Sequence, residues 1–207
     1  MEKKVFDLWA DGYDRDVDVT DDKGLYPFAG YKKLLNYVYN RVLQKKGAKV
    51  LDIGFGTGVL TAKLYDAGCL ITGLDFSGRM IEIARSKMPS ARLIEWYFAQ
   101  GLPEELKGER FDFVTSTYAL HHIDDGKKAE LIGSLLPRLK REGKILIGDV
   151  SFETRDDLIQ CKNECGKYWD GEEFYFVAEE MIAALAKYEC SYEKISHCAG
   201  VLIVENE

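Results

Sequence analysis

The residues best suited to chemistry lie in one short stretch, Val50-Leu51-Asp52-Ile53-Gly54-Phe55-Gly56-Thr57-Gly58. An apolar run ends in an acid, glycines then alternate, and an amphipathic segment follows. This order predicts a strand, a tight turn and a helix, the first βα unit of an open parallel sheet with a ligand on the turn. Gly54, Gly56 and Gly58 let backbone approach that ligand closely, where any Cβ would be in the way.

The spacing of the glycines narrows the choice of ligand. A dinucleotide-binding fingerprint, G-x-G-x-x-G, needs glycine at position 59, where this chain has Val59. A second acid, Asp75, ends the apolar run 70–75, about 20 residues beyond the glycines. An acid at that place can accept hydrogen bonds from both hydroxyls of a ribose. The spacing therefore disfavours a dinucleotide, and the acid at position 75 suits a ligand that carries a ribose.

With Asp52 two residues before the first glycine, the stretch resembles motif I of the class I S-adenosylmethionine (SAM) dependent methyltransferases. The resemblance covers nearly the whole chain and implies SAM as the cofactor. The glycines would then face its methionine end, Asp52 would accept from its ammonium group or organise the turn, and Asp75 would hold the ribose. The cofactor-binding residues expected from this part of the chain are Asp52, Gly54, Phe55, Gly56, Gly58, Asp75, Phe76 and Met80.

The adenine position departs from the family. Many relatives have an aspartate near the end of the third strand, a few residues before a Leu-Pro, which accepts from the adenine amino group. The corresponding stretch here is 96–103, with Leu102-Pro103 but no acid. We expect Tyr97 or Phe98 to occupy the position of this aspartate, with Gln100 or a backbone carbonyl accepting the hydrogen bond from the adenine amino group.

A pair of histidines follows the fourth predicted strand, in Ser116-Thr117-Tyr118-Ala119-Leu120-His121-His122-Ile123. This stretch resembles the "LHH" signature of small-molecule methyltransferases. Ligands of such sheets bind at the carboxyl ends of the strands, so Thr117 and Tyr118 are expected to contact the cofactor. One histidine would buttress the loop, and the other would either face the methyl acceptor and take a proton near neutral pH or have a structural role as well. Asp149, at the end of the fifth strand, is a second candidate base.

Two histidines also raise the question of a metal site. Adjacent residues point in different directions on a helix or strand, and neither an H-E-x-x-H motif nor a carboxylate at ligand spacing accompanies His121 and His122. We expect no metal. The five cysteines show no disulfide or metal-finger pattern, and we expect reduced, structural thiols.

Alternating patterns along the chain predict the elements that position these residues. Five strands (49–52, 70–75, 92–98, 111–117 and 144–150) alternate with helices, including one over 31–42 and one whose apolar face extends to Leu139. Two closing β-prone runs, 192–198 and 200–205, suggest a hairpin with its break at Ala199-Gly200. The expectation is an α/β fold: a doubly wound, mostly parallel seven-stranded sheet with helices on both faces and a C-terminal antiparallel hairpin.

The domain organisation follows from the same reading. We expect one domain over residues 1–207, with residues 1–30 as a lid segment and 151–190 as a variable cap. Trp9-Ala10-Asp11-Gly12-Tyr13-Asp14 resembles a "YD" segment that forms part of a cofactor lid in many of these methyltransferases; the alternative is a core-packing N-terminal helix. Tyr13 would then face the cofactor. Trp9, Trp169 and Tyr175 are further aromatic candidates to enclose a substrate.

Composition limits the partners. Lys and Arg total 28 against 35 Asp and Glu, a formal charge of −7, with no long basic run. Nucleic-acid and anionic-membrane binding are therefore disfavoured. Neither a membrane-spanning run nor the apolar core of a signal peptide occurs, so we expect a cytoplasmic protein.

Together these observations predict a SAM-dependent methyltransferase that acts on a small-molecule acceptor by in-line displacement. Two alternatives remain open at this point: a module that binds SAM without transferring its methyl group, and an NAD-binding oxidoreductase.

Overall fold

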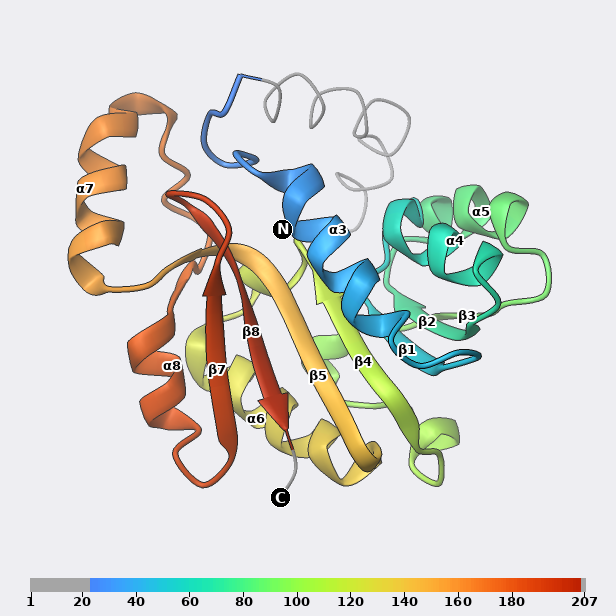
Figure 1. The fold of residues 1–207 in the computed structure, drawn as a ribbon. Helices are drawn as coiled ribbons and strands as arrows, with labels where there is room; N and C mark the ends of the chain where they lie inside the picture. Colours follow the sequence, from blue (N-terminus) through green and yellow to red (C-terminus); the bar gives the residue numbers. More distant parts are fainter. Residues whose placement is uncertain (1–22, 206–207) are drawn as a thin grey trace.

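The computed structural model of the protein describes residues 23–205, which form a twisted α/β sheet with helices on both faces (Figure 1). The strands lie in the order β3-β2-β1-β4-β5-β8-β7, and a short β6 pairs with β5 off this path. Their bounds are β1 Lys49–Ile53, β2 Leu70–Asp75, β3 Arg92–Glu95, β4 Phe111–Thr117, β5 Leu139–Phe152, β6 Phe176–Val177, β7 Glu189–Lys194 and β8 Ala199–Glu205. The sequence-based expectation of a seven-stranded path with a closing hairpin is confirmed, with β6 as an addition.

Strand direction matches the prediction. β1, β2, β3, β4 and β5 are mutually parallel where they pair, whereas β8 runs antiparallel to both β5 and β7. Because these strands run in the same direction, the carboxyl ends of β1, β2, β4 and β5 lie toward the same edge of the sheet. The residues that follow these strands are therefore brought side by side, although they come from distant parts of the sequence.

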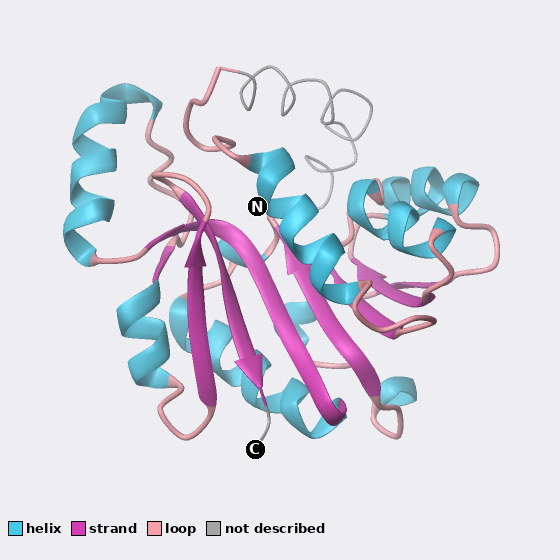
Figure 2. Ribbon diagram, in the orientation of Figure 1, coloured by secondary structure: helices cyan, strands magenta, loops and turns pink. Residues whose placement is uncertain are grey.

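Helices connect successive strands and lie on both faces of the sheet (Figure 2). Their bounds are α3 Tyr31–Val42, α4 Val59–Asp66, α5 Gly78–Lys87, α6 Asp125–Leu135, α7 Arg155–Cys165 and α8 Ala178–Ala184. Local chemistry sets the starts of two of them: the Ser77 hydroxyl accepts from the Met80 N–H at 3.2 Å, and the Asp124 carboxylate accepts from the Lys127 N–H at 3.0 Å.

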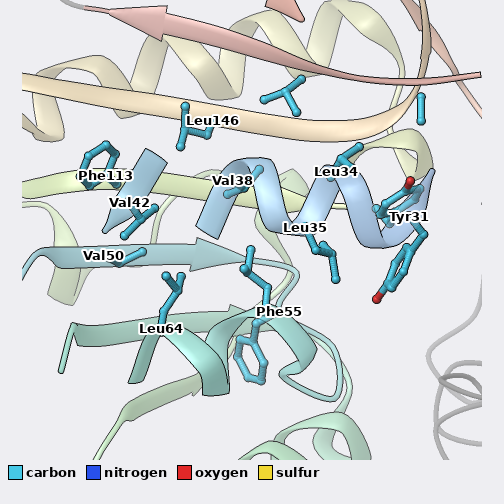
Figure 3. Packing of buried hydrophobic residues seen from close by; sticks show 14 of the residues in the cluster. Tyr31, Leu34, Leu35, Val38, Val42, Val50, Phe55, Leu64, Phe113 and Leu146 are labelled. Atoms are coloured by element: carbon cyan, nitrogen blue, oxygen red, sulfur yellow. The ribbon is translucent and has the colours of Figure 1, made fainter. Parts of the chain in front are cut away.

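Helix α3, with α4 and α5, forms the apolar layer on one face of the sheet. Its buried side chains recur at helical spacing and pack toward β1, β4 and β5 (Figure 3); they are Tyr31, Leu34, Leu35, Val38 and Val42. Gly148 of β5 makes the close approach of this helix possible, since a Cβ there would lie 2.4 Å from Leu34 Cδ2. Burial of each such Leu or Val side chain contributes about 1.5–3 kcal/mol to the free energy of folding. This packing holds the loop that precedes α3 against the edge where the strands end.

The opposite face is covered mainly by α6 and α8. Leu131, Ile132 and Leu135 of α6 pack with apolar residues of β1, β4 and β5, and Met181 of α8 joins the same cluster. Side chains therefore fill both faces of the central strands, which explains their almost uninterrupted apolar sequences.

Several predicted boundaries were wrong. β3 ends at Glu95, and Phe98–Gln100 form a 3₁₀ turn instead of continuing the strand. Leu139 opens β5 and is not part of the preceding helix, which ends at Leu135. The hairpin turns at residues 195–198, and Gly200 pairs with Lys194 as part of β8, with the Tyr192 ring where a Cβ of residue 200 would lie.

Two further observations bear on the sequence-based expectations. Trp9, Tyr13 and most of the proposed lid lie outside the described residues. Among residues 23–205, no helix combines the length and apolar character needed to cross a membrane.

Candidate active site

A cavity of about 370 Å³ opens at the carboxyl ends of β1, β2, β4 and β5. Its walls bring together the glycine turn after β1, the end of β2, the residues after β4 and the loop before β6. The predicted site residues that line it are Gly54, Phe55, Gly56, Asp75, Phe76, Met80, Phe98, Thr117, Tyr118, His121, His122 and Tyr175. Its volume falls in the range of small-molecule sites, about 300–1,000 Å³.

The glycine turn forms one end of this cavity. Gly54 and Gly56 have φ values of +69° and +57°, which favour glycine. A Cβ on Gly54 would lie 2.4 Å from Ala119 Cβ, whereas one on Gly56 would meet nothing within 4 Å. The turn therefore packs tightly against the segment after β4 at Gly54 and leaves open space beside Gly56.

Asp75 ties the ends of β1 and β2 together. Its buried carboxylate accepts from the Gly56 N–H at 2.8 Å and from the Ser77 N–H at 2.9 Å. The side chain also lines the cavity, next to Phe76 and Met80. This is the position at which the sequence places a ribose-binding acid.

Asp52 and Gly58 lie behind the cavity and do not line it. The Asp52 carboxylate accepts from the hydroxyls of Thr61 at 2.5 Å and Thr115 at 2.9 Å, so it organises the turn from below. Burial raises the pKa of Asp52 to about 6, against the hydrogen bonds that lower it. Gly58 begins α4 at φ +80°, and a Cβ there would be 3.0 Å from Met88 Cε. Both positions support the turn from outside the cavity.

The residues after β3 divide between the cavity and the surface. Phe98 is buried and lines the cavity, whereas Tyr97 is 41% exposed, does not line it and packs against Phe76 and Phe98. Of the two aromatic candidates for the adenine position, the structure thus brings Phe98 to the cavity. Tyr97 reaches the site only through its neighbours.

The histidine pair lies on the wall farther along the cavity, within a 3₁₀ turn, Leu120–His122. His121 Nδ1 is 2.6 Å from Asp149 Oδ1, and His122 Nδ1 is 2.9 Å from Glu173 Oε2. Burial lowers the pKa of His121, but Asp149 outweighs it, so the pKa lies above its usual value. Burial lowers the pKa of His122, and Glu173 only partly offsets this.

Asp149 acts through His121 and does not itself line the cavity. It is buried, and it accepts from the backbone N–H groups of Leu120 at 3.0 Å, His121 at 3.1 Å and Val150 at 2.8 Å. The carboxylate therefore has a fixed position, and it fixes the ring of His121 in turn.

Aromatic side chains form the remaining wall. The Tyr26 and Tyr175 hydroxyls are 2.6 Å apart, and Tyr26 stacks on Trp169 with ring centroids 5.2 Å apart. Burial raises the pKa of both tyrosines. Trp169 supports this wall without lining the cavity. Sequence reasoning missed several lining residues, Tyr26, Phe28, Tyr31, Tyr168, Asp170 and Glu173, because no local motif marks them.

Comparison with known proteins identifies methyltransferases as the relatives of this chain. Residues 50–143 match the family model described as "Methyltransferase domain". An uncharacterized methyltransferase of Anoxybacillus flavithermus is 38% identical over 152 residues, which cover 73% of this chain and 68% of that protein. One from Alkaliphilus oremlandii is 30% identical over 185 residues, covering 89% of this chain and 82% of the relative.

Solved structures share the fold. The DhpI–SAH complex superposes with a TM-score of 0.72 at 17% identity, covering 99% of this chain and 94% of that one. Magnesium protoporphyrin IX methyltransferase from Synechocystis with bound SAH superposes with a TM-score of 0.70 at 18% identity, covering 99% of this chain and 100% of that one.

Proposed function

The chain belongs to the class I SAM-dependent methyltransferases, and from this premise we propose that it transfers the methyl group of SAM to a small-molecule acceptor. One observation carries the proposal: a single cavity joins the glycine turn and Asp75 to the histidine pair and the aromatic wall. In a protein that only binds SAM, we would expect the cavity to be blocked beyond the cofactor end, where an acceptor would otherwise bind. Here the cavity continues past that end to side chains suited to contacting an acceptor.

The residues at the glycine turn fit the cofactor. The open space beside Gly56 accommodates a ligand where a Cβ would otherwise stand. The backbone from Gly54 to Thr57 would hold the methionine end, and the Asp75 carboxylate would accept from the ribose hydroxyls. Phe76, Met80 and Phe98 offer apolar surfaces to the adenine. SAM supplies an electrophilic methyl carbon on a positively charged sulfur.

The chain contributes alignment and exclusion of water. An in-line displacement requires the nucleophile, the methyl carbon and the sulfur to lie on one line, so catalysis depends on how the acceptor is held. Tyr26, Tyr31 and Tyr175 provide a largely apolar wall that limits solvent. We assign His121 and His122 to contact with the acceptor, and Asp149 to positioning of His121.

Turnover with unfractionated metabolites tests this proposal. We expect formation of the demethylated product of SAM when the full-length protein is incubated with SAM and a metabolite extract of low molecular weight. The melting temperature should rise with SAM or its demethylated product in proportion to ligand excess, and should not respond to NAD. Ligand-induced stabilisation without turnover on any extract would support the binding module; a response to NAD alone would support the oxidoreductase.

A further inference from the structure

The side chains of His121, His122 and Glu173 form a compact cluster on the cavity wall. Each offers one nitrogen or oxygen atom, and these three atoms lie within 4.8 Å of one another. Glu173 comes from the loop before β6, more than 50 residues beyond the histidines. Two bonds fix this loop: the Phe174 N–H donates to the His121 carbonyl at 2.8 Å, and Lys128 Nζ donates to the Phe174 carbonyl at 2.5 Å.

The spacing within the cluster suits a metal ion. Two ligands about 2.1 Å from one ion, in tetrahedral or octahedral geometry, are roughly 3.0–3.4 Å apart. His122 Nδ1 and Glu173 Oε2 are separated by 2.9 Å, so small side-chain adjustments would place an ion between them. The side chains of His121, His122 and Glu173 are 13%, 18% and 9% exposed, which matches a site on a cavity wall.

His121 is oriented as a metal-binding histidine usually is. Its Nδ1 pairs with the buried Asp149 carboxylate at 2.6 Å, which leaves Nε2 as the donor to a metal ion. Carboxylates commonly hold metal-binding imidazoles from behind in this way. The three backbone N–H groups on Asp149 keep this support rigid.

The charge of the cavity also favours a cation. Asp75, Asp170 and Glu173 line it, and no lysine or arginine of the described chain does. Lys128 lies close by, but its ammonium group is bonded to Asp125 and to the Phe174 carbonyl. The cluster therefore has acidic surroundings, and the nearby ammonium group already has partners.

We propose that His121, His122 and Glu173 bind one divalent transition-metal ion whose remaining positions face the methyl acceptor. Two imidazoles and one carboxylate favour ions such as Zn²⁺, Co²⁺ or Fe²⁺ over Mg²⁺ and Ca²⁺. This deepens and rests on the proposed methyl transfer: an acceptor hydroxyl bound to the ion loses its proton to water at lower pH. The oxygen lone pair then forms the C–O bond, and the C–S electrons stay on sulfur.

Titration of the chelator-treated full-length protein with Co²⁺ tests the site. We expect one ion per chain by calorimetry, with visible absorption bands of nitrogen and oxygen ligation and no near-ultraviolet thiolate band. Glu173→Gln should weaken binding at least 100-fold, and His122→Gln likewise. The matched controls Glu172→Gln and His197→Gln alter exposed residues outside the cavity and should bind like the parent.

Asp149→Asn separates a metal site from a hydrogen-bonded cluster, because it should weaken Co²⁺ affinity 10–100-fold through His121 alone. Absence of binding, a thiolate band, or equal affinity in Glu173→Gln would overturn the proposal. Affinity for the demethylated product of SAM is measured on the same samples. If the parent protein binds the product but no Co²⁺, only the metal site is wrong, whereas a parent protein that binds no product contradicts the proposed function.

Discussion

The carboxylate of Asp75 accepts from the N–H of Gly56 at 2.8 Å, so the end of β2 holds the glycine turn that follows β1. One side chain thus both shapes the turn and faces the cavity that the turn borders. We therefore expect position 75 to link the conformation of the glycine turn to the binding of a ribose.

Asp75→Ala should abolish measurable SAM binding. Hydrogen bonds to a charged group contribute about 1.5–3 kcal/mol each, so losing two ribose contacts weakens affinity by roughly two orders of magnitude or more. Calorimetry with the demethylated product of SAM measures this. His122→Ala, on the far wall, should keep cofactor affinity; parent-like binding by Asp75→Ala would remove the ribose role.

Gly54→Ala should destabilise the protein by about 2–4 kcal/mol, because it combines a positive φ with overpacking against Ala119. The new Cβ would lie 2.4 Å from Ala119 Cβ. Adding Ala119→Gly removes the clash but not the backbone strain, so the double variant should recover part of the loss. Chemical denaturation of the parent, the two single variants and the double variant measures this, and strict additivity of the two substitutions would contradict this account.

Asp52→Asn should become more stable relative to the parent as pH rises from about 4 to 7. The pKa of Asp52 in the folded state, about 6, lies above its ordinary value. The folded parent therefore binds this proton more tightly than the unfolded chain does, and it loses stability as the proton is released over that pH interval. A shift of about two pH units corresponds to roughly 2–3 kcal/mol. Denaturation curves at several pH values test this, and a pH-independent difference would show that burial does not perturb Asp52.

Asp112 gives the opposite pH dependence. Burial acts against its ionised form, but hydrogen bonds from Lys140, Lys45 and the Lys49 N–H outweigh this and lower its pKa to about 2. Its contribution is therefore complete above about pH 4 and is lost as pH falls toward 2. Because both lysine side chains are about half exposed, we expect roughly 1 kcal/mol. Asp112→Asn should reduce stability at pH 7 and converge with the parent near pH 2.

Tyr26→Phe should raise the KM for the acceptor while leaving cofactor affinity unchanged. The substitution removes the hydroxyl that bonds Tyr175 at 2.6 Å and accepts from the Asp170 N–H at 3.1 Å, so the aromatic wall loosens at a cost of about 1 kcal/mol. Steady-state kinetics on the identified acceptor measure it. Tyr65→Phe, outside the cavity, is the control. A weaker cofactor affinity in Tyr26→Phe would show that Tyr26 contacts the cofactor end of the cavity instead of the acceptor end.

Much of the fold was predictable because its signals are local. The period of α3, the Ser77 cap and the glycine spacing after β1 each lie within a dozen residues, where backbone sterics and hydrogen-bonding chemistry act directly. The hairpin was also predictable from its two β-prone runs, but its turn lies at 195–198, because Gly200 is packed under the Tyr192 ring within β8 and does not form the break.

The sequence by itself determined the glycine turn, the acid at position 75 and the histidine pair, because each depends on residue type at the end of a recognisable strand. Only the tertiary structure decided what faces them. It put Asp52 behind the cavity, turned Tyr97 outward and brought Tyr26 and Glu173 to the wall. The expectation of no metal depended on the lack of a carboxylate at ligand spacing from the histidines, whereas folding brings Glu173, from a distant part of the chain, to 2.9 Å from His122. Such contacts arise from packing between distant segments, so spacing along the chain does not reveal them.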